Sequence, residues 1–170
     1  HIAYRKANLL VKAGAIVDVI APEIEPELRQ LVEQSTGQYI QAHFSDSILA
    51  TPYRLVIAAT DQPDVNKAVF EQCEARNLLV NSVDDIPHCR FMVPAIIDRS
   101  PLVVSVASNG ASPVLSRQLR TQIETIVPHG MGKLAEFSGL WRKQVKEKIS
   151  NPDERRIFWE NLYASPLKEQ

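Results

Sequence analysis

Short apolar runs alternate with segments of helical period through the first ninety residues of the chain. The apolar runs have the length and composition of strands and lie at residues 15–22, 39–42, 55–59 and 78–81. The intervening segments place their apolar positions on one helical face and lie at residues 1–14, 25–34 and 64–77, with one further turn at 45–49. Because the links are short, this alternation predicts an α/β fold with a doubly wound parallel sheet.

The pattern changes after residue 90. Two strand-like runs, 91–98 and 102–108, follow each other without a helix, which predicts a hairpin, and Pro94 interrupts the first of them. Ser112 and Pro113 then have the chemistry of an N-cap and a first helical position for a helix that ends near residue 126. Two more helices are predicted at 131–150 and 151–162. The chain therefore divides into three predicted modules, 1–90, 91–127 and 128–170.

Composition excludes several classes of protein. The chain has 170 residues, of which 45% are hydrophobic, and its net charge is -1, so it offers no basic excess for a nucleic acid partner. No apolar run approaches the ~20 residues of a membrane span. The two cysteines, Cys73 and Cys89, form no CxxC pair, which favours a reducing, cytoplasmic location. Cys73 is expected in the core, whereas Cys89 is either packed or an exposed thiol. The histidines form no ligand pair, so we expect no resident metal.

The candidate chemistry lies at two predicted strand ends. The third run ends in Thr60 and Asp61, and the fourth continues as Asn81-Ser82-Val83-Asp84. An open α/β sheet places its working residues just beyond the carboxyl ends of its strands. Asp84 is therefore a candidate catalytic carboxylate, and the alternative is an ordinary N-cap or turn aspartate.

Six short motifs, in order along nearly the whole chain, resemble one family. They are Ala3-Tyr4-Arg5-Lys6-Ala7, Ala58-Ala59-Thr60-Asp61, Asn81-Ser82-Val83-Asp84, Phe91-Met92-Val93-Pro94-Ala95-Ile96-Ile97-Asp98-Arg99, Asn109-Gly110-Ala111-Ser112-Pro113 and Glu154-Arg155-Arg156-Ile157-Phe158-Trp159. The chain thus resembles the precorrin-2 dehydrogenase/sirohydrochlorin ferrochelatase module of sirohaem synthases. The resemblance implies a Rossmann-like NAD-binding domain (1–90), a small α+β dimerisation domain (91–127) and a C-terminal helical domain (128–170), assembled as a homodimer.

The resemblance also implies an activity and roles for residues. The activity is NAD-dependent oxidation of precorrin-2 to sirohydrochlorin, followed by insertion of ferrous iron, a substrate, to give sirohaem. Asp84 corresponds to the essential aspartate, a general base or an aid to metal insertion, although Asp85 is adjacent. The implied NAD contacts are His1, Ile2, Pro22, Glu23, Ala59, Thr60 and Asp61, with Asp18 as an alternative to Glu23 for the ribose.

Precorrin-2 carries eight carboxylates, so its site needs local positive charge despite the net charge of -1. The candidates for binding it are Arg90, Arg99, Arg117, Arg120 and His88. The basic residues of the last two helices are interpreted as a solvated face. Trp141 and Trp159 are interpreted as core residues of that segment.

The chain departs from the family at two places. The family's first strand and glycine-rich phosphate loop precede the first helix and have no counterpart here, which indicates a fragment of a longer protein. Ala107 stands where relatives have serine. Two other functions stay open: a dehydrogenase without chelatase activity, and a Rossmann-type module that binds a nucleotide or tetrapyrrole without turnover.

Overall fold

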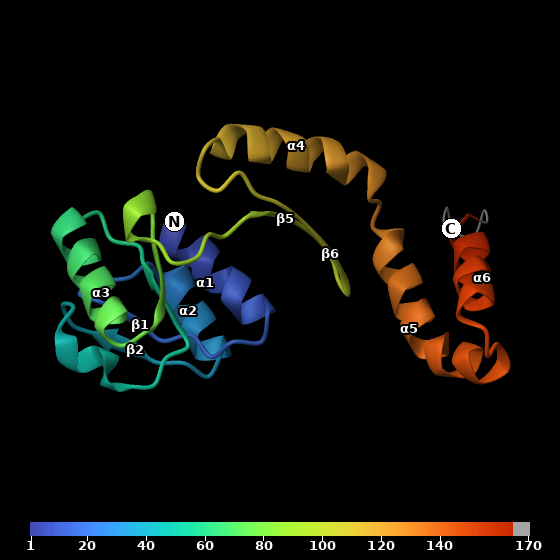
Figure 1. Ribbon diagram of the computed structural model, residues 1–170. Coiled ribbons are helices and arrows are strands. Elements are labelled where there is room, and N and C mark those ends of the chain that lie inside the picture. The colour runs from blue at the N-terminus through green and yellow to red at the C-terminus, as the bar shows by residue number, and fades with distance from the viewer. Residues whose placement is uncertain (165–170) are drawn as a thin grey trace. The chain divides into compact units, whose positions relative to one another are not determined.

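The computed structural model describes residues 1–164 and divides the chain into two compact units, His1–Met92 and Val93–Gln170 (Figure 1). The first unit alternates helix and strand as the sequence predicts. Its helices are α1 (Ile2–Lys12), α2 (Pro26–Gln34) and α3 (Pro63–Ala75), with 3-10 turns η1 (Asp46–Ala50) and η2 (Ile86–His88). Its strands are β1 (Val19–Ala21), β2 (Tyr39–Gln41), β3 (Leu55–Ala58) and β4 (Leu79–Ser82).

The strands of this unit form two parallel pairs. β1 pairs with β2, and β3 pairs with β4, so the described residues contain no continuous four-stranded sheet. Each pair has its own buried apolar cluster. Leu28, Leu31 and Val32 of α2 pack in the cluster near β1, and Val69 and Cys73 of α3 pack with Val80 of β4. Cys73 is fully buried, as predicted, and burial raises the pKa of its thiol.

The first strand is shorter than the run 15–22 predicts. Ile16 is exposed, and the backbone N–H of Val17 donates to Ser35 Oγ at 3.3 Å instead of to a neighbouring strand. Gly37 explains the close approach here, because a Cβ atom at this position would lie 2.0 Å from the Val17 carbonyl oxygen. The apolar run therefore begins as a tight contact between loops and becomes a strand only at Val19.

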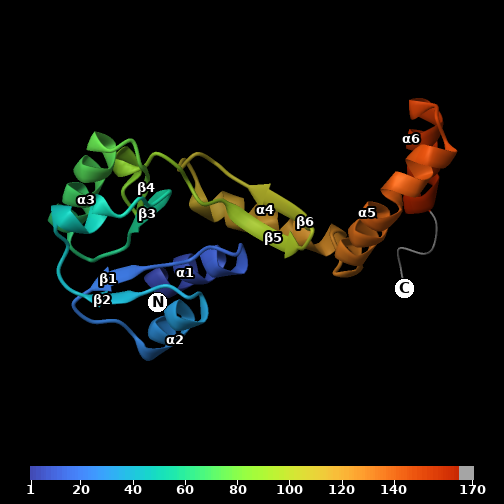
Figure 2. The same ribbon diagram turned by 90° about the horizontal axis from the view of Figure 1, so that it is seen from below.

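The second unit consists of an antiparallel hairpin and three helices. The hairpin is β5 (Ala95–Arg99) with β6 (Leu102–Val106), and the helices are α4 (Pro113–Ile126), α5 (Gly130–Lys148) and α6 (Pro152–Ala164). Figure 2 shows α4 lying along the hairpin. Ser112 caps α4 as predicted, because its Oγ accepts the N–H of Leu115 at 3.3 Å.

The predicted strand 91–98 begins only at Ala95. Proline lacks the N–H that a paired strand uses, so Pro94 delays pairing until the next residue. None of the helices that the structure describes is long and apolar enough to cross a membrane.

Gly132 on α5 permits a close contact with the hairpin turn. A methyl group at Gly132 would lie 2.3 Å from the backbone oxygen of Arg99 and 2.8 Å from that of Ser100. Gly139, on the same helix, has no atom within 4 Å of the corresponding position. The backbone of the hairpin turn is therefore packed directly against α5 where the helix has no side chain.

We expect Gly132→Ala to lower the free energy of unfolding by about 2 kcal/mol, because the added methyl group must push backbone atoms apart. Gly139→Ala is the matched control and should raise it by about 1 kcal/mol, since alanine favours the helix. Urea unfolding of both variants measures the difference. Equal unfolding free energies would contradict the contact between α5 and the hairpin turn.

Candidate functional site

The carboxyl ends of β3 and β4 lie side by side. The register pairs Ala58 with Ser82, and the N–H of Val83 donates to the carbonyl oxygen of Ala58 at 2.9 Å. The loop that begins at Ala59 and the turn that contains Asp84 therefore leave the sheet at one edge. This is the edge where open α/β folds bind their ligands.

The loop after β3 is held by a residue that the sequence did not single out. Asn66 on α3 is buried, and its Oδ1 accepts both the Thr60 hydroxyl at 2.8 Å and the Thr60 N–H at 3.3 Å. Its Nδ2 donates to the Thr60 carbonyl oxygen at 3.0 Å. The three bonds fix the loop backbone while Asp61 stays exposed to solvent. Asn66 lies eight residues beyond the end of β3, and its burial, which indicates this role, is visible only in the structure.

The turn after β4 gives its two aspartates different surroundings. Asp84 is exposed and adopts a left-handed conformation with φ of 59°, which is uncommon for a residue other than glycine. Asp85 instead pairs with His88, at 2.6 Å between Oδ2 and Nδ1. The His88 ring in turn packs edge-on against Phe70, with ring centroids 4.9 Å apart. Asp85 is thus committed to a neighbour, and Asp84 faces solvent.

Lys6 on α1 lies close to this turn. Burial lowers the pKa of the Lys6 ammonium, and the charge of Arg5 lowers it further, whereas Cys89 and Asp84 act in the opposite direction. The electrostatic effect of Asp84 on Lys6 means that α1 and the turn after β4 approach each other. The turn therefore places an exposed carboxylate within electrostatic range of a half-buried cation.

The last two residues of β4 carry buried polar atoms without a partner in the described part of the chain. They are Asn81 Oδ1 and Ser82 Oγ. Asn81 Nδ2, in contrast, donates to the Phe91 carbonyl oxygen at 3.0 Å. The Cys89 thiol is half-buried and donates to the carbonyl oxygens of Ser82 at 3.1 Å and Asp85 at 3.2 Å. Cys89 is therefore packed against the turn, and two buried polar atoms at the end of β4 have no hydrogen-bond partner among the described residues.

The two acidic candidates for a ribose contact, Asp18 and Glu23, differ in their surroundings near β1. Asp18 accepts the Gln38 N–H at 2.8 Å and the Tyr53 hydroxyl at 3.0 Å, and burial together with this bond raises the pKa of Tyr53. Glu23 and Pro22 are exposed just beyond the strand. Glu23 is therefore the acidic group that stays accessible. The remaining candidates, His1 and Ile2, are exposed at the start of α1.

Three of the four candidate arginines are already paired with carboxylates. Arg90 forms a two-point ion pair with Glu74, which raises the pKa of Arg90, and its guanidinium also lies over the Phe70 ring. Arg99 and Arg120 share Glu124, at 3.2 and 2.7 Å.

Arg99 also donates to the Val127 carbonyl oxygen, and Arg120 donates to that of Ile96, so both tie α4 to the hairpin. Arg117 is exposed and makes no ion pair with the described residues.

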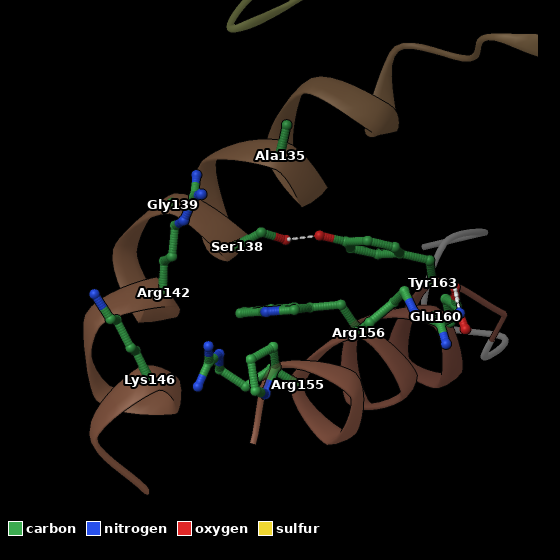
Figure 3. Close-up of a pocket in the computed structure, with 11 residues that line it drawn as sticks. Ala135, Ser138, Gly139, Arg142, Lys146, Arg155, Arg156, Glu160 and Tyr163 are labelled. Carbon is green, nitrogen blue, oxygen red and sulfur yellow. Dashed lines mark hydrogen bonds and ion pairs between the residues drawn. The ribbon is translucent and has the colours of Figure 1, made fainter. Parts of the chain in front are cut away.

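A pocket of about 790 Å³ lies elsewhere, between α5 and α6 in the second unit (Figure 3). It contains none of the residues that the sequence predicts for NAD or catalysis. Its walls are basic and aromatic, with Arg142, Lys146 and Arg155 among the cations.

Among the described residues, no group of three or more His, Cys, Asp or Glu side chains is arranged to hold a metal ion.

Two family models match the chain. One, described as "Putative NAD(P)-binding", matches residues 1–95, and the other, the sirohaem synthase dimerisation region, matches residues 130–170. The chain is similar to the sirohaem synthase of Acinetobacter baylyi, with 77% identity over 170 residues, which is 100% of this chain and 37% of that protein. The corresponding enzyme of Chromobacterium violaceum is 45% identical over 169 residues, covering 99% of this chain and 36% of that protein. The chain therefore spans about a third of the length of these relatives.

A solved structure, "SirC, precorrin-2 dehydrogenase", has a similar fold. Its TM-score is 0.74 at 18% identity, and the match covers 95% of this chain and 79% of that one. At this identity the likeness bears on the fold alone. The predicted α/β architecture, with a Rossmann-like part followed by a smaller unit and helices, is confirmed.

We expect Asn66→Ala to lower the free energy of unfolding by about 2 kcal/mol, because it leaves the polar groups of Thr60 without their partner. Lys67→Ala, an exposed neighbour on α3, is the control and should change it by less than about 0.5 kcal/mol. Urea unfolding measures both, and amide hydrogen exchange at Thr60 should accelerate only in Asn66→Ala. Indistinguishable variants would show that the network adds no stability.

We also expect Asp84→Asn to lower the pKa of Lys6 further, because the Asp84 carboxylate raises that pKa in the native protein. Asp61→Asn removes a charge from the other loop and should leave the Lys6 pKa unchanged. NMR titration of isotopically methylated lysines reads the Lys6 pKa directly. If Asp84→Asn has no effect, the two side chains are not neighbours in solution.

Proposed function

Because the chain belongs to the NAD(P)-binding family whose model matches its residues 1–95, we propose that it binds NAD and oxidises precorrin-2 to sirohydrochlorin. We propose further that it inserts ferrous iron, as a second substrate, to give sirohaem. The observation that carries this function is the exposed Asp84 carboxylate on a left-handed turn at the shared edge of β3 and β4. The relatives named sirohaem synthases and the neighbour named a precorrin-2 dehydrogenase support it.

The residues at this edge fit a bound dinucleotide. Asn81 Oδ1 and Ser82 Oγ are buried polar atoms that lack a partner among the residues the structure describes, and such atoms are costly unless a ligand or water satisfies them. Asn66 holds the Thr60 backbone in place, and Ala59 and Asp61 flank it. Glu23 is accessible for the ribose hydroxyls, because Asp18 is occupied by Gln38 and Tyr53. NAD supplies the hydride acceptor when it is bound there.

Asp84 is proposed as the general base of both steps. Oxidation of precorrin-2 removes two electrons and two protons, as one hydride and one proton, and the Asp84 carboxylate takes that proton. A carboxylate suits this role since it is anionic near neutral pH and can accept a proton. Iron insertion releases two protons from pyrrole nitrogens, which Asp84 accepts in turn and passes to water. Asp85 serves a different purpose, because it orients the His88 ring through Nδ1 and leaves Nε2 for the substrate.

The substrate's carboxylates need cations that the fold does not already use. Within the part of the chain that the structure describes, Arg117 forms no ion pair, whereas Arg90, Arg99 and Arg120 each share their charge with a glutamate. We therefore assign Arg117 and His88 the leading roles in holding precorrin-2 and sirohydrochlorin. The three paired arginines contribute through whichever donors remain free.

We also propose that the protein is a cytoplasmic homodimer with domains at residues 1–90, 91–127 and 128–170. The match to a sirohaem synthase dimerisation region supports self-association, although it falls on 130–170, the predicted helical domain. The predicted dimerisation domain, 91–127, also exposes apolar side chains, including Val103, Val114 and Leu115. Both segments are therefore candidates for the contact between protomers.

We expect Asp84→Asn in the full-length protein to slow NADH formation from precorrin-2 by about 10²- to 10⁴-fold, as loss of a general base does. NAD affinity should stay unchanged, since the amide has the shape of the carboxylate. Asp85→Asn is the matched control and should slow the reaction by less than about tenfold, because it loosens His88 without removing the base. Stopped-flow absorbance and NAD titration provide the two measurements.

Iron insertion into sirohydrochlorin without NAD separates the alternatives. The proposal requires insertion by the native protein and its loss in Asp84→Asn. Dehydrogenation without any insertion would indicate a dehydrogenase only. Binding of NAD and precorrin-2 by the native protein with no turnover would leave a binding module.

A further inference from the structure

The pocket between α5 and α6 is formed by two facing helical stripes, which we call the basic groove. Ser138, Arg142 and Lys146 follow one another at helical spacing on α5. Arg155, Trp159 and Tyr163 do the same on α6. Figure 3 shows Ser138 and Tyr163 meeting at one end of the groove, with Arg142 and Lys146 farther along α5.

The basic groove concentrates positive charge that the fold does not neutralise. Arg142 and Lys146 lie one turn apart on the same face of α5, an arrangement that costs an isolated helix a few tenths of a kcal/mol. Neither side chain forms an ion pair with the residues that the structure describes. The carboxylate among the lining residues belongs to Glu160, and it is paired with Arg156 at 3.0 Å. A chain of net charge -1 thus keeps uncompensated cations together at one place.

Other groups in the groove are held rigidly. Arg155 donates to the carbonyl oxygens of Ile149 and Ser150, both at 2.7 Å, which fixes its guanidinium beside the end of α5. The Tyr163 hydroxyl donates to Ser138 Oγ at 3.0 Å. The Tyr163 and Trp159 rings are nearly parallel, at 20° and 6.0 Å between centroids. The groove therefore offers ordered aromatic surface beside ordered positive charge, so a ligand loses little side-chain entropy on binding.

We propose that the basic groove is a second binding site, apart from the residues assigned to the reaction, for a planar, conjugated ligand that carries several carboxylates, namely the tetrapyrrole of the proposed reaction. The identity of this ligand rests on the proposed function, whereas the class of ligand rests on the groove. Guanidinium and ammonium groups on two helices match carboxylates spread around a ring, and the stacked pair Trp159 and Tyr163 adds aromatic surface to the lining. The volume of about 790 Å³ lies within the range of small-molecule sites.

The test is an absorbance titration of the full-length protein with sirohydrochlorin at fixed ionic strength. We expect the native protein to bind sirohydrochlorin at two sites, and Arg142→Glu with Lys146→Glu to weaken one of them by about 30-fold, because two attractive charges become repulsive. Lys133→Glu with Lys143→Glu is the matched control, since it makes the same change of charge on α5 outside the groove, and it should weaken binding by less than about threefold. Arg142→Gln with Lys146→Gln replaces the reversed pair if circular dichroism shows that pair to be unfolded. Trp159→Leu should weaken binding by about tenfold through lost stacking.

The outcomes separate this inference from the proposed function. If NADH formation persists and the groove variants bind sirohydrochlorin like the control, the groove is overturned and the function stands. If NADH formation is absent but the groove variants lose affinity, the groove stands and the function fails. No binding by the native protein overturns both. Full displacement of sirohydrochlorin by millimolar inorganic phosphate would overturn the tetrapyrrole assignment, since it would indicate a simple oxyanion site.

Discussion

The parallel pairing of β3 with β4 is the constraint on which the candidate site depends. Parallel strands leave a sheet in the same direction, so two segments more than twenty residues apart in sequence must end at one edge. The register Ala58–Ser82 fixes how far each loop extends before its polar residues begin. Asn66 then fixes the loop after β3 by donating to the Thr60 carbonyl oxygen, and Asn81 donates to the Phe91 carbonyl oxygen beyond the turn after β4. The position of Asp84 therefore depends on the register of β3 and β4.

Two adjacent aspartates acquire different roles because the backbone turns between them. The left-handed conformation of Asp84 directs the chain so that Asp85 meets His88 in the following 3-10 turn. One carboxylate is thereby bonded to a histidine that packs on Phe70, and the other remains exposed within electrostatic range of Lys6. Sequence alone ranks the two only by register, whereas the structure distinguishes them by their contacts. Strain at a residue such as Asp84 is often associated with function, since the fold must hold it in place.

Much of the fold was predictable because it rests on local patterns. The alternation of apolar runs and helical segments, the Ser112 cap and the buried Cys73 all follow from sequence and are confirmed. The strand limits were less predictable, since Gly37 shortens β1 through a contact between loops distant in sequence. The roles of Asn66 and Lys6 were not predictable for the same reason, because each depends on a partner that tertiary structure supplies.

The number of arginines in a sequence does not show how many of them can bind an anionic ligand. Sequence offers Arg90, Arg99 and Arg120 as carboxylate ligands, yet each already binds a glutamate of its own fold unit. An arginine that shares its charge with a glutamate presents less positive potential to a ligand than an unpaired one. Cations available to a ligand are instead those without an ion pair among the described residues, such as Arg117, Arg142 and Lys146. A protein with net charge -1 can therefore bind a polycarboxylate, because local pairing and not total charge determines where positive potential remains.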